Sequence, residues 1–108
     1  MASSSFQQQL NELYRQSNKL LYEVEGDINE IYTNQSKADD LDNTCSLIRK
    51  KVDMAYHKSE ELKEFFNDNM HSQIPNDMTK RTYWSEKIDR QYQSISKLAT
   101  NLDRAVRN

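Results

Sequence analysis

The chain has 108 residues with a formal net charge of −2, which suits one domain over residues 1–108 and provides no field that favours nucleic acid or a membrane surface. Glycine and proline occur once each, and a mean hydropathy of −1.04 fits slender helices that each bury one stripe, so we expect an all-α protein. No apolar run approaches the ~20 residues of a membrane span, and the only cysteine excludes an intrachain disulfide, so we expect a soluble protein in a cytosolic setting.

The first predicted helix covers residues 5–32. Its apolar residues recur at alternating steps of four and three, which is the period of a helix and not of a strand. They are Phe6, Leu10, Leu13, Leu20, Val24, Ile28 and Ile31, with Ser17 in the one polar place of the series. One of Ser3, Ser4 and Ser5 is the expected N-cap, and Gly26 is expected to be tolerated inside the helix without a packing role.

The second predicted helix covers residues 38–67 and follows a polar loop at residues 33–37. Its candidate N-caps are Ser36 and Asp39, and several aspartates crowd its first turn, where the helix dipole favours negative charge. Its stripe comprises Leu41, Cys45, Ile48, Val52, Ala55, Ser59, Leu62 and Phe66.

The third predicted helix covers residues 76–106. Before it, a connection over residues 67–76 contains Pro75, which bars the preceding residue from the helical region. Asn76 or Asp77 is the expected N-cap. The stripe of this helix comprises Trp84, Ile88, Ile95, Leu98, Leu102 and Ala105.

Three helices with one apolar stripe each must bury those stripes against one another. Short connections make sequential helices antiparallel, and the alternating four-three steps indicate knobs-into-holes packing at small crossing angles. We therefore expect an elongated antiparallel up-down-up three-helix bundle that is a monomer in solution.

Residues with catalytic or metal-binding chemistry are sparse in this sequence. Asp53, His57 and Glu61 lie one turn apart and form the best candidate for half of a metal site. However, they share the polar face of their helix, so surface ion pairs are the favoured interpretation. Cys45 falls on an apolar stripe and is expected to be a buried, unreactive thiol. We expect no enzyme activity, no cofactor and no bound metal.

Aromatic residues at the edges of the stripes are the candidates for contact with a partner protein. Tyr14, Tyr22, Tyr56 and Phe65 are the residues expected at this rim. Exposed aromatic side chains often anchor protein interfaces, although tyrosines with a buried ring and a hydrated hydroxyl are common in helical bundles.

Three parts of the sequence resemble membrin-like Golgi SNAREs of the Qb class. The segment LYRQSN at residues 13–18, with Val-Glu at residues 24–25, resembles the leucine-aromatic-x-glutamine-threonine pattern and the isoleucine-glutamate pair of the family's opening helix. Ile-Pro at residues 74–75 and Lys-Ile-Asp at residues 87–89 resemble its valine-proline and arginine-valine-aspartate. In the third helix, the positions where the family has leucine, leucine, threonine, serine and leucine are occupied here by Ile95, Leu98, Thr100, Asn101 and Leu102.

The resemblance covers the first and third helices and is weak in the second. Gln91 and Tyr92 depart from the family's leucine and lysine. The resemblance implies an N-terminal three-helix domain that binds other SNAREs or trafficking proteins, or that modulates assembly of the fusion complex, in transport between endoplasmic reticulum and Golgi. It also implies a SNARE motif and a C-terminal membrane anchor after Asn108, with the domain on the cytoplasmic face of Golgi membranes.

Two other interpretations fit the same residues. One is a free-standing helical adaptor that dimerises through an apolar stripe and ends naturally at Asn108. The other is a metal-dependent enzyme built on Asp53, His57 and Glu61. Sedimentation, the downstream reading frame and elemental analysis distinguish these interpretations from the SNARE domain.

Overall fold

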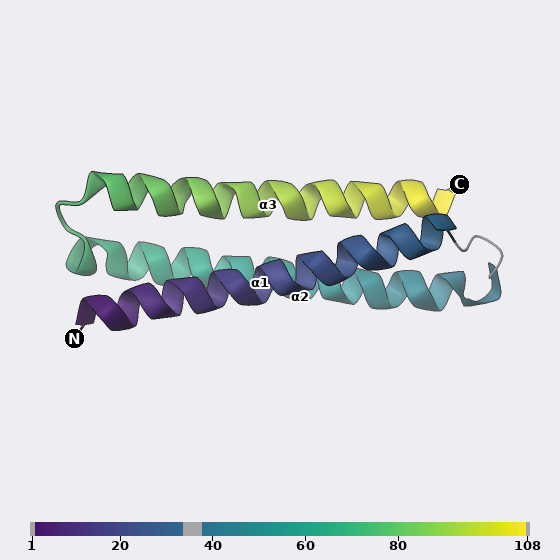
Figure 1. The fold of residues 1–108 in the computed structure, drawn as a ribbon, viewed down its shortest axis with the longest axis horizontal. Helices are drawn as coiled ribbons and strands as arrows, with labels where there is room; N and C mark the ends of the chain where they lie inside the picture. Colours follow the sequence, from purple (N-terminus) through teal and green to yellow (C-terminus); the bar gives the residue numbers. More distant parts are fainter. Residues whose placement is uncertain (1, 34–37, 108) are drawn as a thin grey trace.

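The structure, a computed structural model, describes residues 2–33 and 38–107. They form three helices, α1 (Ala2–Thr33), α2 (Ala38–Gln73) and α3 (Met78–Arg107), with no strand in the described part of the chain. The helices lie side by side along a rod with Cα extents of 55 × 20 × 17 Å, and α1 and α3 run in the same direction (Figure 1). The predicted all-α up-down-up three-helix bundle is confirmed.

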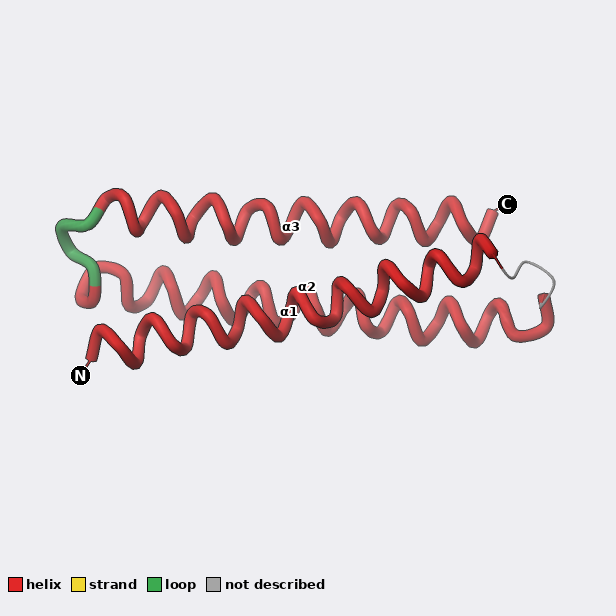
Figure 2. The backbone as a smooth tube through the Cα atoms, viewed as in Figure 1, coloured by secondary structure: helices red, strands yellow, loops and turns green. Residues whose placement is uncertain are grey.

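Helix α2 is longer than the sequence predicts, because it continues to Gln73 instead of ending near residue 67. The polar side chains near its end bond back to its own carbonyls: Asn69 Nδ2 donates to Phe65 O at 2.9 Å, and Ser72 Oγ donates to Asn69 O at 3.1 Å. Residues 67–73 contain neither glycine nor proline, so nothing stops the helix before Pro75. The predicted ten-residue connection is therefore wrong, and the true one spans residues 74–77 (Figure 2).

The start of α3 has the predicted aspartate cap. Asp77 Oδ1 accepts a hydrogen bond from the amide of Lys80 at 3.0 Å, which satisfies one of the amides that a helix start leaves without a partner. Arg81 ties the connection to this helix, because its Nε donates to Ile74 O at 2.9 Å. Pro75 and Asp77 together set where the chain reverses.

Of the caps predicted for the other two helices, those of α1 and the Asp39 candidate of α2 differ from the structure. Because α1 begins at Ala2, Ser3, Ser4 and Ser5 lie inside the helix and are not its N-cap. Because α2 begins at Ala38, Asp39 is also inside its helix. Ser36, the other candidate, lies outside the described residues. Nothing in these segments prevents helical backbone, so the three serines and Asp39 lie inside the first turns of their helices and not at the cap positions.

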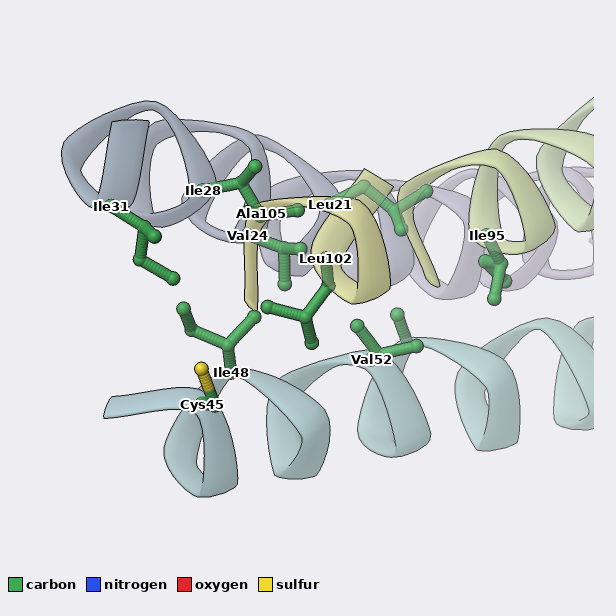
Figure 3. Close-up of a cluster of buried hydrophobic side chains, with 11 residues drawn as sticks. Leu21, Val24, Ile28, Ile31, Cys45, Ile48, Val52, Ile95, Leu102 and Ala105 are labelled. Atoms are coloured by element: carbon green, nitrogen blue, oxygen red, sulfur yellow. The ribbon is translucent and has the colours of Figure 1, made fainter. Parts of the chain in front are cut away.

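The core consists of two apolar clusters at opposite ends of the rod. The Ile48 cluster lies toward the C-terminal end of α3, and its side chains from all three helices point toward one another (Figure 3). It comprises Leu21, Val24, Ile28, Ile31, Cys45, Ile48, Val52, Ala55, Ile95, Leu102 and Ala105. The Trp84 cluster fills the other end with Phe6, Leu10, Leu13, Leu62, Phe66, Trp84 and Ile88.

A layer of three buried polar residues separates these clusters. Ser17 of α1, Ser59 of α2 and Gln91 of α3 are each less than 4% exposed, and hydrogen bonds link all three. We call this set the polar layer. The sequence places Ser17 and Ser59 on their stripes, whereas the predicted third stripe passes from Ile88 to Ile95 without Gln91.

Candidate partner-binding grooves

The residues of the candidate metal half-site, Asp53, His57 and Glu61, lie on the surface of α2 and do not pair with one another. The His57 side chain is 71% exposed, and its Nδ1 lies 3.4 Å from Glu60 Oε1 instead of pairing with Asp53 or Glu61. Asp53 and Glu61 are also exposed. Within the described residues, no group of three or more histidine, cysteine, aspartate or glutamate side chains is arranged to hold a metal ion.

Cys45 is buried in the Ile48 cluster, as the stripe predicts. Burial raises the pKa of its thiol above the ordinary value, and the opposing effect of the Arg49 charge is smaller. The guanidinium of Arg49 lies 3.8 Å from Asp103 Oδ1. The thiol is therefore held in its protonated form, which is a poor nucleophile.

The four predicted rim residues separate into two pairs. Tyr14 and Phe65 pack against the Trp84 cluster: Tyr14 meets Trp84 edge to face at 6.1 Å between ring centroids, and Phe65 stacks on Phe6 at 5.7 Å. Tyr22 and Tyr56 are 77% and 43% exposed. The exposed pair lies in two different grooves, so the four residues do not form one surface.

The larger groove runs between the parallel helices α1 and α3 and has a volume of about 630 Å³. Leu21, Ile28 and Leu98 contribute its apolar part, and the exposed Tyr22 and Tyr32 contribute aromatic rings from α1. The other lining residues are Asn18, Glu25, Asn29, Ser94, Lys97 and Asn101. We call this the α1–α3 groove; its charged residues, one glutamate and one lysine, lie on opposite helices.

The smaller groove, of about 380 Å³, lies between α2 and α3. Tyr56 and Tyr92 meet there edge to face at 5.7 Å, and Lys63 Nζ lies 5.6 Å from the Tyr92 ring centroid. Burial raises the pKa of Tyr92, and the negative charge of Glu60 adds to this effect. This groove is thus smaller than the α1–α3 groove and is lined by three charged residues instead of two, and its lysine already lies over the Tyr92 ring.

Ion pairs bridge the remaining edge of the bundle, between α1 and α2. Lys51 Nζ of α2 lies 2.8 Å from Asp27 Oδ2 and 3.8 Å from Glu23 Oε2 of α1. The hydrogen bond to Asp27 raises the pKa of Lys51, and α1 packs more extensively on α2 than on α3. The edge between α1 and α3 is therefore the one with most room for a partner.

Two features of this site were missed at the level of sequence. Tyr32 joins Tyr22 at the α1–α3 groove. The signal in the sequence is the series of steps of three, four and three residues from Tyr22 through Glu25 and Asn29 to Tyr32, which keeps all four on one side of the helix. Lys87 of α3 lies over Tyr14 of α1, a contact between distant residues that no local spacing reveals.

A comparison of the chain with protein-family models, curated proteins and solved structures finds no match. None of the helices, within the residues that the structure describes, is both long enough and apolar enough to span a membrane.

Proposed function

We propose that this chain is a protein-interaction domain from the N-terminal part of a membrin-like Golgi SNARE, and that it acts by binding and not by catalysis. The observation that carries the proposal is the open α1–α3 groove, where Tyr22 and Tyr32 flank the apolar side chains of Leu21, Ile28 and Leu98. An exposed aromatic pair beside apolar side chains is a typical anchor for a partner helix or peptide.

The positions that carry the family resemblance support the proposal. Leu13, Ser17 and Val24 of the opening pattern are buried in α1, and Ile95 and Leu102 of the closing pattern are buried in α3. These residues determine how the bundle packs, so a family with the same pattern is expected to share the fold. The departure at Gln91 is accommodated by hydrogen bonds to Ser59 and Asn18.

The mechanism we propose is docking of an amphipathic helix or an extended segment along the α1–α3 groove. The apolar side chains of the docked segment contact the groove between Tyr22 and Tyr32. Glu25 of α1 and Lys97 of α3 face the two sides of that segment. Partners of this kind are other SNAREs and trafficking proteins at the cytoplasmic face of Golgi or endoplasmic reticulum–Golgi membranes. Occupancy of the groove then recruits a partner or controls assembly of the fusion complex.

Calorimetric titration of the domain with purified SNARE motifs of the Qa, Qc and R classes tests this proposal. We expect one class to bind, and the double variant Tyr22→Ala, Tyr32→Ala to weaken that binding at least tenfold. The matched control is Tyr56→Ala, which removes a 43% exposed tyrosine of the smaller groove between α2 and α3 and should leave affinity unchanged. Equal loss in both variants, or no binding by any class, contradicts the proposal.

A concentration-dependent dimer in sedimentation would favour the alternative, a free-standing adaptor that associates through its own apolar surface. If Tyr22→Ala, Tyr32→Ala converted that dimer to a monomer, the α1–α3 groove would be a self-association surface.

A further inference from the structure

The geometry of the polar layer determines which acceptors its two serine hydroxyls contact. Ser59 Oγ lies 2.6 Å from Gln91 Oε1, a carbonyl oxygen that can only accept, so the Ser59 proton is donated there. Ser17 Oγ lies 2.9 Å from Ala55 O and 3.0 Å from Ser59 Oγ. The single Ser17 proton is therefore shared between these two acceptors.

The Gln91 amide has one orientation that satisfies its neighbours. Its Nε2 lies 3.2 Å from the Tyr14 carbonyl oxygen and 2.9 Å from Asn18 Oδ1, and a carbonyl can bond only to a donor. Both amide protons thus point at α1 while Oε1 points at Ser59 of α2. Within the described residues, no buried side-chain nitrogen or oxygen lacks a hydrogen-bond partner.

We propose that the polar layer fixes the rotation and axial register of α3 in the bundle, and that it does so at some loss of stability. This inference goes beyond the proposed function and does not depend on it. A buried polar group in a helical seam selects the one alignment in which its hydrogen bonds are made. Replacing such a group by an apolar residue often stabilises the fold but makes alternative alignments accessible.

The apolar residues of α3 alone discriminate poorly between rotations of that helix. Tyr92, Ala99 and Val106 already lie partly buried beside the seam, so turning α3 toward them exchanges one apolar row for another. The same turn would move Gln91 away from Ser59 and from the Tyr14 carbonyl. The connection at residues 74–77 is short, so rotation of α3 is easier than sliding along the rod.

The residues of the polar layer also disfavour sliding of α3 along the rod. A shift of α3 by seven residues would bring Gln91 to the place of Trp84 or of Leu98, both in apolar surroundings. Ser59 would then face an apolar side chain and lose its acceptor. Each incorrect alignment therefore leaves a buried donor or acceptor without a partner, whereas the observed one satisfies all of them.

The double variant Ser59→Ala, Gln91→Leu tests the inference, because Ser17 keeps the Ala55 carbonyl as acceptor and Asn18 can bond to water in the α1–α3 groove. Isoleucine δ1 methyl resonances report alignment, since Ile88 and Ile95 flank Gln91 on α3. We expect the wild type to give one sharp set of methyl peaks. The variant should give doubled or broadened peaks for Ile88 and Ile95, together with an unchanged or higher urea midpoint.

The matched control is Gln93→Leu, which makes the same chemical change at an exposed position of α3 and should leave the methyl peaks single. One sharp set of peaks in the double variant, with the wild-type pattern of nuclear Overhauser contacts between α3 and the other helices, would overturn the inference. So would loss of folding or a lower urea midpoint, since the layer would then be required for stability instead of alignment.

Discussion

Lys87 Nζ of α3 lies 4.4 Å from the ring centroid of Tyr14 in α1. The same ammonium lies 5.0 Å and 5.1 Å from the centroids of Tyr83 and Trp84, and it donates a 2.9 Å hydrogen bond to Tyr83 Oη. A cation enclosed by three aromatic rings links α1 to α3 just before the α1–α3 groove begins at Asn18. The edge between these helices is therefore closed at one end and open along the rest.

Replacing Lys87 with methionine keeps the aliphatic stem and removes the charge. We expect the free energy of unfolding to fall by about 0.5–1 kcal/mol, the range for a partly exposed cation–π contact. Trp84, the only tryptophan, should also change its fluorescence emission. Lys63→Met is the control, because Lys63 lies over a single ring at 5.6 Å; an equal loss in both variants would show that the three-ring enclosure adds nothing.

Gly26→Ala should raise the free energy of unfolding by about 1 kcal/mol, the difference in helix propensity between the two residues. No neighbouring atom lies within 4 Å of the position that a Cβ would take at Gly26, so the added methyl group meets no obstacle. Urea unfolding measures the change. A decrease would mean that Gly26 serves a close approach that the structure does not contain.

Asp77→Ala should lower the free energy of unfolding by about 1 kcal/mol, the usual effect of losing an N-cap. The reason is the loss of the 3.0 Å hydrogen bond from the Lys80 amide to Asp77 Oδ1. Asn76→Ala, one residue earlier, serves as the control and should have little effect in the same thermal melts. If the two variants had equal melting temperatures, the assignment of the cap would be wrong.

The stripes predict most of the fold because each helix buries most of its four-three residues, and Val52 and Trp84 lie in the core as expected. Leu20, Leu41 and Leu98 are only partly buried, and Leu21 enters the core beside Leu20. Gln91 was missed because a glutamine is ordinarily a surface residue, and its burial depends on two serines that lie far away in the sequence. The end of α2 was missed because Asn69 and Ser72 favour turns in isolation but bond to helix carbonyls here.

The candidate site is less predictable than the fold. Tyr14 and Tyr22 lie on the same helix, yet Tyr14 packs on Trp84 while Tyr22 is 77% exposed. Which tyrosine is covered depends on where α3 crosses α1, and the periodicity of one helix does not contain that information. The periodicity of one helix therefore identifies candidate rim residues, whereas the packing of the helices determines which of them are exposed.

The free energy of unfolding should decrease in alkaline solution because the thiol of Cys45 titrates. Burial raises the pKa of this thiol in the folded chain above its ordinary value of 9.0, so the unfolded chain releases the proton first as the pH rises. The contribution of the buried Cys45 thiol to the free energy of unfolding is therefore fully present below about pH 9. This contribution is lost as the pH rises through the pKa of the thiol in the folded chain. Urea midpoints between about pH 8 and pH 10 measure this loss.

Cys45→Ala provides the comparison, because Lys51 also contributes to the pH dependence. The pKa of Lys51 is raised by its hydrogen bond to Asp27, so its contribution to the free energy of unfolding is also lost at higher pH, in the wild type and in the variant alike. The difference between wild type and variant isolates the thiol and should shrink with increasing pH. A difference that stayed constant across this range would show that the thiol titrates alike in both states.

Mapping where a partner contacts the bundle tests most directly whether the α1–α3 groove is the binding site. The ¹⁵N-labelled domain would be titrated with purified SNARE motifs of the Qa, Qc and R classes, and the amide shifts mapped onto the helices. We predict that the largest shifts lie on the two walls of the α1–α3 groove, residues 18–32 of α1 and 94–101 of α3. Shifts confined to α2, or an unchanged spectrum at saturating partner, would contradict the claim that this groove is the binding site.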